Sequence, residues 1–159
     1  MNNKCKESNF NIVLFKPQIP PNTGNIIRLC SNTGSSLHLI KPLGFNIDDK
    51  ALRRAGLDYH KNVIINEYES IDDCLNKLKI RDVFFITKFG TEKYSDSTYK
   101  VGDTLIFGSE IDGIPQKVMN KYKSYKKLFI PMKFDNRSLN LSNAVSICLY
   151  EAWKQNNFI

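Results

Sequence analysis

Three polar segments hold the side chains that are best suited to chemistry. The first, residues 20–28, reads Pro-Pro-Asn-Thr-Gly-Asn-Ile-Ile-Arg and places Asn25 and Arg28 about one turn apart on one face of a predicted helix. Amides at the start of a helix can bind an anion. On these residues alone a plainer interpretation is favoured, in which Asn22 or Thr23 caps the helix and Arg28 is a solvated charge.

The second segment, residues 105–115, is an apolar strand that breaks into a turn with two glycines and two carboxylates. Gly108 and Gly113 let the backbone approach a flat ligand closely. Glu110 and Asp112 can bond ligand hydroxyls or amines, although solvated acids are also usual in turns. The spacing is not G-x-G-x-x-G, which disfavours a Rossmann-type cofactor site.

The third segment begins at 130–132, Ile-Pro-Met, and passes through a polar loop into the last predicted helix. It carries Ser138, Asn140, Ser142 and Asn143 within six positions. Helix capping accounts for one or two of these side chains. Four neutral hydrogen-bonding groups together equally indicate a polar ligand such as a nucleoside.

A basic and aromatic cluster lies between the first two segments. Arg53, Arg54, Tyr59 and His60 can hold phosphates and stack on bases. No serine or cysteine nucleophile accompanies His60 in a recognisable motif, so no hydrolase arrangement is indicated. The net charge of +7 favours a polyanionic partner. A general abundance of lysine in the chain would give the same charge without any function.

Short apolar runs alternate with helical patterns along the chain. Strands are predicted at 11–15, 37–40, 63–65, 83–87, 104–107 and 128–130, and helices from about 21–23 to Gly34 and over 48–55, 70–79 and 141–155. Apolar runs without alternation are typical of a parallel sheet covered on both faces. We therefore predict one α/β domain, residues 1–159, with a mostly parallel sheet sandwiched by helices and with His38 packed in its core. Ligands bind beyond the carboxyl ends of such strands, where all three polar segments fall.

The rest of the sequence bears on where the protein works and on metal or redox sites. No run approaches the roughly 18 apolar residues of a membrane span, and the first residues lack the apolar core of a signal peptide. The four cysteines form no C-x-x-C pair, so neither a zinc site nor a redox motif is indicated. We expect a cytoplasmic protein with no membrane partner.

At these segments the sequence resembles the SPOUT superfamily of knotted RNA methyltransferases. Within it, the sequence is similar to the tRNA wobble-nucleotide (cytidine/uridine-34) 2′-O-methyltransferase family. The resemblance runs from about residue 11 to 155, and it is carried by the motifs IPPNTGNIIRLC, LRRAGLDYH, LIFGSEIDGIP and IPM followed by RSLNLSNAVSICLYEAWKQ. It implies a C-terminal trefoil knot, which physical reasoning alone disfavours. It also implies a homodimer whose active sites include both subunits.

The resemblance further implies S-adenosylmethionine as the cofactor, no metal, and the anticodon stem-loop of tRNA as the partner, with leucine tRNAs as the expected substrates. The implied cofactor residues are Ile86, Gly108, Ile130, Ser138 and Leu139, the implied catalytic residues are Asn25, Arg28, Glu110 and Asn140, and the implied substrate-binding residues are Arg53, Arg54, Tyr59 and His60. Arg28 matches the arginine proposed to activate the ribose hydroxyl. Because a guanidinium is a poor general base, we assign Arg28 to positioning the hydroxyl or a phosphate.

Two departures from the family pattern stand out. Ser109 replaces a common proline, and Thr87-Lys88-Phe89-Gly90 replaces a common Thr-Thr-Lys-Gly. Residues 1–9 have no counterpart and are expected to be a flexible extension. Two alternatives stay open: 2′-O-methylation of another RNA such as ribosomal RNA, and an RNA-binding protein without catalysis.

Overall fold

A parallel sheet forms the centre of the molecule. The computed structural model describes residues 8–48, 50, 63–79, 81–134 and 137–159. Within them, seven strands pair in the order β3-β2-β1-β6-β4-β7-β5, and every pair is parallel. The strands are β1 (Asn11–Phe15), β2 (Ser36–Ile40), β3 (Ile65–Tyr68), β4 (Val83–Ile86), β5 (Glu92–Lys93), β6 (Thr104–Phe107) and β7 (Lys126–Phe129). The predicted fold class is confirmed; the knot stays a prediction.

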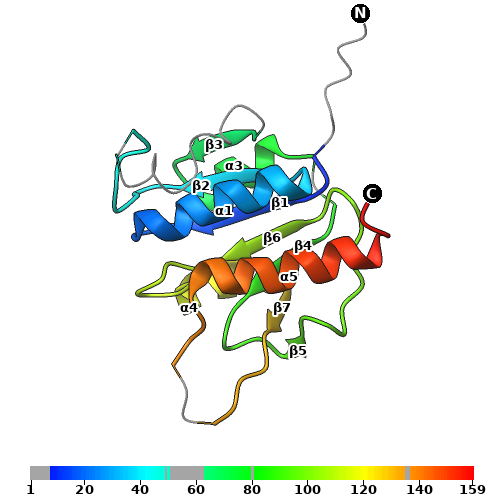
Figure 1. The fold of residues 1–159 in the computed structure, drawn as a ribbon. Helices are drawn as coiled ribbons and strands as arrows, with labels where there is room; N and C mark the ends of the chain where they lie inside the picture. Colours follow the sequence, from blue (N-terminus) through cyan, green and yellow to red (C-terminus); the bar gives the residue numbers. More distant parts are fainter. Residues whose placement is uncertain (1–7, 49, 51–62, 80, 135–136) are drawn as a thin grey trace, which may run out of the picture.

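Helices cover both faces of this sheet. They are α1 (Pro20–Thr33), α3 (Ile71–Lys77), α4 (Gln116–Lys121) and α5 (Leu141–Gln155). Helices α1 and α5 lie side by side over one face, as Figure 1 shows. Along β1, Ile12 and Leu14 join the core beneath α1 and α5, whereas Val13 and Phe15 join the core that includes α3 and α4. This two-sided burial explains why the central strands β1, β4 and β6 are apolar without alternation.

The helix boundaries test the predicted caps. Helix α1 begins at Pro20 with Ile19 as its N-cap, so the predicted cap at Asn22 or Thr23 is wrong. The reason is that the first two helical positions accept proline, whose missing N–H would be unpaired there. Ser70 caps α3, within the helix predicted over 70–79, because its Oγ accepts a hydrogen bond from the Asp73 N–H at 3.1 Å.

Other predictions differ at the edges of elements. The strand predicted at 63–65 is found at β3, and the one predicted at 128–130 begins two residues earlier as β7. Strand β5 and helix α4 were not predicted, since they are only two and six residues long. The helix predicted over 48–55 falls largely outside the described residues. His38 is buried as predicted, with its ring nitrogens 2.8 Å from Ser36 Oγ and 3.1 Å from Tyr68 Oη.

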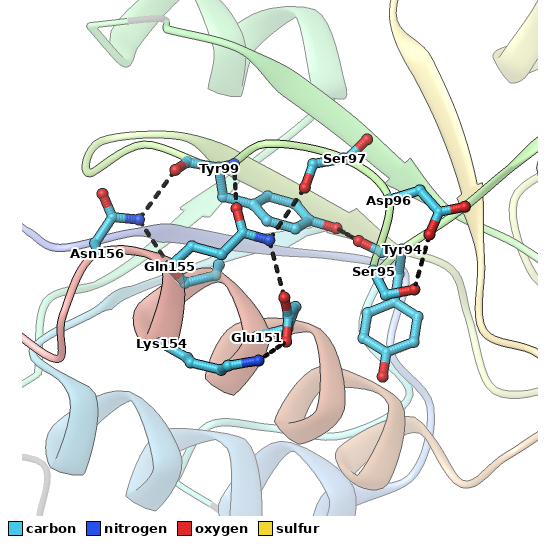
Figure 2. A network of polar contacts seen from close by, with 10 residues as sticks. Tyr94, Ser95, Asp96, Ser97, Tyr99, Glu151, Lys154, Gln155 and Asn156 are labelled. Carbon is cyan, nitrogen blue, oxygen red and sulfur yellow. Dashed lines mark hydrogen bonds and ion pairs between the residues drawn. The ribbon is translucent and has the colours of Figure 1, made fainter.

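The end of α5 holds the segment that returns from β5 to β6. Figure 2 shows Gln155 reaching this segment with both atoms of its amide. Its Oε1 accepts from the Tyr99 N–H at 3.0 Å, and its Nε2 donates to the Ser97 carbonyl at 3.1 Å. Asn156 Nδ2 donates to the Tyr99 carbonyl at 3.0 Å. Two side chains thus pair with residues 97–99 much as a neighbouring strand would.

No helix within the described part of the chain has the length and apolar character to cross a membrane.

Candidate functional site

A pocket of about 400 Å³ opens where the central strands end. Strands β4, β6 and β7 are neighbours in the sheet, so their carboxyl ends bring residues 86–89, 107–114 and 130–132 together. The loop before α5 and its first turn close the remaining side through Ser138, Asn140 and Leu141, among others. The position agrees with the general rule that ligands bind beyond the carboxyl ends of parallel strands.

The turn after β6 forms one wall of the pocket by folding back on itself. Ser109 and Gly113 form an antiparallel bridge, in which the Gly113 N–H donates to the Ser109 carbonyl at 2.9 Å. A Cβ atom at Gly108 would lie 2.5 Å from the Gly113 carbonyl carbon and 2.6 Å from the Ile114 nitrogen. Gly113 has a φ of +63°. Both glycines are therefore required by the turn itself, independently of any ligand.

Glu110 joins this turn to the start of α1. Its Oε2 accepts from the Gln18 N–H at 2.8 Å, and its Oε1 accepts from the Ile19 N–H at 3.0 Å. Asn22 Nδ2 also donates to Oε1, at 3.3 Å. Both carboxylate oxygens are thus engaged by the segment that enters α1. The geometry favours a positioning role for Glu110 over direct contact with a reacting atom.

Asn140 connects α5 to the same group. It is the N-cap of α5, with Oδ1 accepting from the N–H groups of Ser142 and Asn143 at 2.9 and 3.3 Å. Its Nδ2 donates to Asn22 Oδ1 at 2.9 Å. Glu110, Asn22 and Asn140 therefore form a polar link between β6, α1 and α5. The sequence suggested Asn22 only as a helix cap. Asn22 is buried, and the two prolines before it are half-buried and exposed, so no local pattern indicates that its side chain joins this polar link.

The five residues proposed to bind a cofactor all line the pocket. Their positions are at the end of β4 (Ile86), after β6 (Gly108), after β7 (Ile130) and in the loop before α5 (Ser138 and Leu139). Glu110 and Asn140, proposed as catalytic, line it as well. The strand ends contribute mostly apolar side chains and backbone groups, an environment suited to a largely apolar ligand with a few polar atoms.

The other proposed residues lie elsewhere. Asn25 and Arg28 are exposed on α1 and are not among the residues that line this pocket. They are one helical turn apart, as predicted. Arg53, Arg54, Tyr59 and His60 lie outside the described residues.

Two further features of the described residues concern possible metal ligands and thiols. Within them, no group of three or more His, Cys, Asp or Glu side chains is placed to hold a metal ion. Cys30, Cys74 and Cys148 are buried. Burial raises the pKa of each of these thiols to about 12, which keeps them protonated and poorly nucleophilic.

Known proteins are similar to this chain in sequence and in fold. The sequence pattern of the SpoU rRNA methylase family matches residues 9–150. The chain is 47% identical to a tRNA (cytidine(34)-2′-O)-methyltransferase of Methylovorus glucosotrophus, with 94% of this chain and 97% of the relative covered. It is 50% identical to the enzyme of that name in Escherichia coli, with 91% and 92% covered.

Solved structures of other proteins are similar to this chain in fold. One, from work on the 2-OH methylation of C/U34 on tRNA, superposes with a TM-score of 0.86 at 37% identity and covers 93% of this chain and 96% of its own. The SpoU methyltransferase AviRb of Streptomyces viridochromogenes, in complex with the cofactor AdoMet, gives a TM-score of 0.79 over 99% of this chain and 63% of its own. At 21% identity the second likeness is one of fold.

Proposed function

Because this chain belongs to the SpoU rRNA methylase family, we propose that it transfers a methyl group from S-adenosylmethionine to the ribose 2′-hydroxyl of nucleotide 34 in tRNA. The family membership confirms the resemblance drawn from the motifs. The observation that carries the proposal is the pocket at the ends of β4, β6 and β7, which gathers all five residues expected to bind the cofactor. Relatives at 47–50% identity over nearly the whole chain bear the name of this activity.

The pocket fits S-adenosylmethionine in size and chemistry. Its volume of about 400 Å³ lies within the usual range for small-molecule sites, roughly 300–1,000 Å³. Apolar side chains such as Ile86 and Ile130 suit a flat ring, while backbone groups and Ser138 offer hydrogen bonds. A structural neighbour of the same fold was solved with AdoMet, which supports this assignment. When bound, the sulfonium would supply an already activated methyl group, and the products would be S-adenosylhomocysteine, the 2′-O-methylated RNA and the proton of the hydroxyl.

The protein's part in such a reaction is mainly alignment. The turn after β6 and the loop before α5 shape the pocket wall, and the link through Glu110, Asn22 and Asn140 fixes these two segments against α1. We assign these three side chains to holding the pocket geometry. Apolar residues at the strand ends exclude water from the transfer.

Arg28 and Asn25 require a second subunit in this proposal. They lie on the exposed face of α1, outside the pocket of their own chain. We propose that the protein is a homodimer in which α1 of one subunit presents these side chains to the pocket of the other. The Arg28 guanidinium then positions the ribose hydroxyl or the adjoining phosphate through hydrogen bonds.

The remaining assignments concern the substrate. We propose that Arg53, Arg54, Tyr59 and His60 hold the anticodon stem-loop, that leucine tRNAs are the substrates, and that the enzyme works in the cytoplasm. The net charge of +7 supports an RNA partner.

The experiment is transfer of radiolabelled methyl from S-adenosylmethionine to unfractionated tRNA and, in a parallel reaction, to ribosomal RNA, followed by nuclease digestion to locate the label. Label in a 2′-O-methyl nucleoside at position 34 supports the proposal, and label found only in ribosomal RNA replaces it. Arg28→Ala is expected to abolish transfer while the circular dichroism spectrum stays unchanged. Full activity of that variant removes Arg28 from the mechanism. Saturable cofactor binding, measured by calorimetry, separates an enzyme from an RNA-binding protein without catalysis.

A further inference from the structure

Exposed apolar side chains surround the mouth of the pocket. Ile19, Phe89, Ile111, Met132 and Leu139 all line it, and each is at least 38% exposed. Phe89 is 64% exposed, whereas Phe107, which also lines the pocket, is buried. A group of exposed apolar side chains around a pocket, unlike a single exposed one, indicates a binding surface.

The backbone that carries Phe89 is fixed to β7. The Thr87 N–H donates to the Leu128 carbonyl at 2.9 Å, and the Thr91 N–H donates to the Lys127 carbonyl at 3.0 Å. Between them, a Cβ atom at Gly90 would lie 2.3 Å from the Leu128 carbonyl carbon, so the turn is pressed directly against that strand.

Local hydrogen bonds also close the turn that presents Phe89. Thr87 Oγ1 accepts from the Phe89 N–H at 3.3 Å, and the Gly90 N–H donates to the Thr87 carbonyl at 3.0 Å. The ring is therefore presented from an ordered turn, and a ligand that stacks on it pays little for ordering the backbone.

A cation lies over this ring. Lys88 Nζ is 5.1 Å from the centroid of the Phe89 ring, and the lysine side chain is exposed. A flat aromatic face beside an ammonium group matches a nucleotide, because the base can stack on the ring while the phosphate meets the cation. The net charge of +7 agrees with a polyanionic ligand at this surface.

Position separates the adenosyl group of the cofactor from the substrate nucleotide, both of which the pocket would hold. The residues assigned to the cofactor lie at the strand ends, where Ile86 is buried and Gly108 and Ile130 are half-buried. Phe89 lies at the solvent side of the same pocket. A methyl acceptor that enters from solvent would place its base on this side of the pocket, next to Phe89.

We propose that Phe89 is a stacking platform for a base of the RNA substrate at the methylation site, and that Lys88 binds an adjoining phosphate. This inference rests on the proposed function and assigns residues where the chain departs from its family pattern. It makes Phe89 a substrate-binding residue with no part in bond making.

The test compares Phe89→Ala with Phe89→Trp and with the control Phe134→Ala. Phe134 is 97% exposed and does not line the pocket, so it controls for the loss of an exposed phenylalanine. Affinity for unfractionated tRNA is measured by filter binding over a range of salt concentrations, and cofactor affinity is measured by calorimetry. Phe89→Ala is expected to weaken tRNA binding about tenfold with an unchanged salt slope, and Phe89→Trp to bind within about threefold of wild type. Lys88→Ala is expected to reduce the salt slope by about 1.

Three results would overturn the inference. One is weaker cofactor binding by Phe89→Ala with unchanged tRNA binding, which would place the cofactor's adenine on the ring. Another is an equal effect of Phe134→Ala. The third is loss of the dimer in sedimentation, which would make Phe89 an interface residue. Because binding is measured directly, Phe89-dependent tRNA binding without methylation at position 34 would refute the proposed function and leave the platform standing.

Discussion

Replacing Glu110 by glutamine is expected to destabilise the protein more clearly than it slows methyl transfer. The carboxylate accepts from the Gln18 and Ile19 N–H groups and from Asn22 Nδ2 through two oxygens. Glutamine keeps the volume but only one acceptor oxygen, so its amide nitrogen must face a donor. One charge-assisted hydrogen bond is worth roughly 1.5–3 kcal/mol, and we expect the free energy of unfolding to fall by about 2 kcal/mol. For a chain of this size, that lowers Tm by about 4–8 °C.

The assay pairs urea unfolding with initial rates of methyl transfer, measured well below Tm. A residue that positions the pocket should lose about tenfold in rate when its hydrogen bonding is impaired, whereas removing a general base usually costs 10²–10⁴-fold. Asp112→Asn, on the same turn and exposed, is the control and should change stability by less than about 0.5 kcal/mol. Unchanged stability of Glu110→Gln together with a loss of more than about 100-fold in rate would refute the positioning role.

Three further perturbations have defined outcomes. Gly108→Ala should weaken cofactor binding at least tenfold in calorimetry, because its Cβ would lie 2.5–2.7 Å from backbone atoms of Gly113 and Ile114, an overlap that costs about 1–3 kcal/mol. Gln155→Ala should lower the free energy of unfolding by about 2 kcal/mol in urea titrations, since the buried Tyr99 N–H loses its acceptor; an unchanged midpoint would show that water replaces the amide. Burial lowers the pKa of His38 to about 4, so between pH 6.5 and 4 the unfolded chain binds a proton that the folded chain does not. Stability should therefore fall with falling pH by up to about 3 kcal/mol through this group, and the fall should be smaller by that amount in His38→Gln.

Periodicity and turn chemistry were enough to predict the layered parallel sheet. The apolar runs of β1 and β6 and the apolar face of α5 are strong local patterns. The rule that ligands bind beyond the carboxyl ends of parallel strands then placed the three polar segments at one edge of the sheet. Elements with weak local patterns were missed or shifted. Strand β5 and helix α4 are too short to show a period.

The roles of individual site residues depend on contacts that no local pattern contains. In the sequence, the turn that carries Glu110 has the polar composition of a solvated turn. Its carboxylate nevertheless accepts hydrogen bonds from backbone N–H groups that lie 91 and 92 positions earlier. Asn140 looks like a cap and is one, but its amide nitrogen also reaches Asn22, 118 positions away. Only the fold shows that these side chains support the pocket. The identities of the cofactor residues came from the family resemblance, and their common position is what the structure adds.

The hydrogen bond between Asn22 and Asn140 also sets when the pocket can exist during synthesis. At usual rates of about 5–20 residues per second, the ribosome needs roughly 6–24 s to add the 118 residues that separate them. The start of α1 is therefore made well before its partner at the start of α5. A nascent chain therefore has no finished site for RNA until the start of α5 has left the exit tunnel.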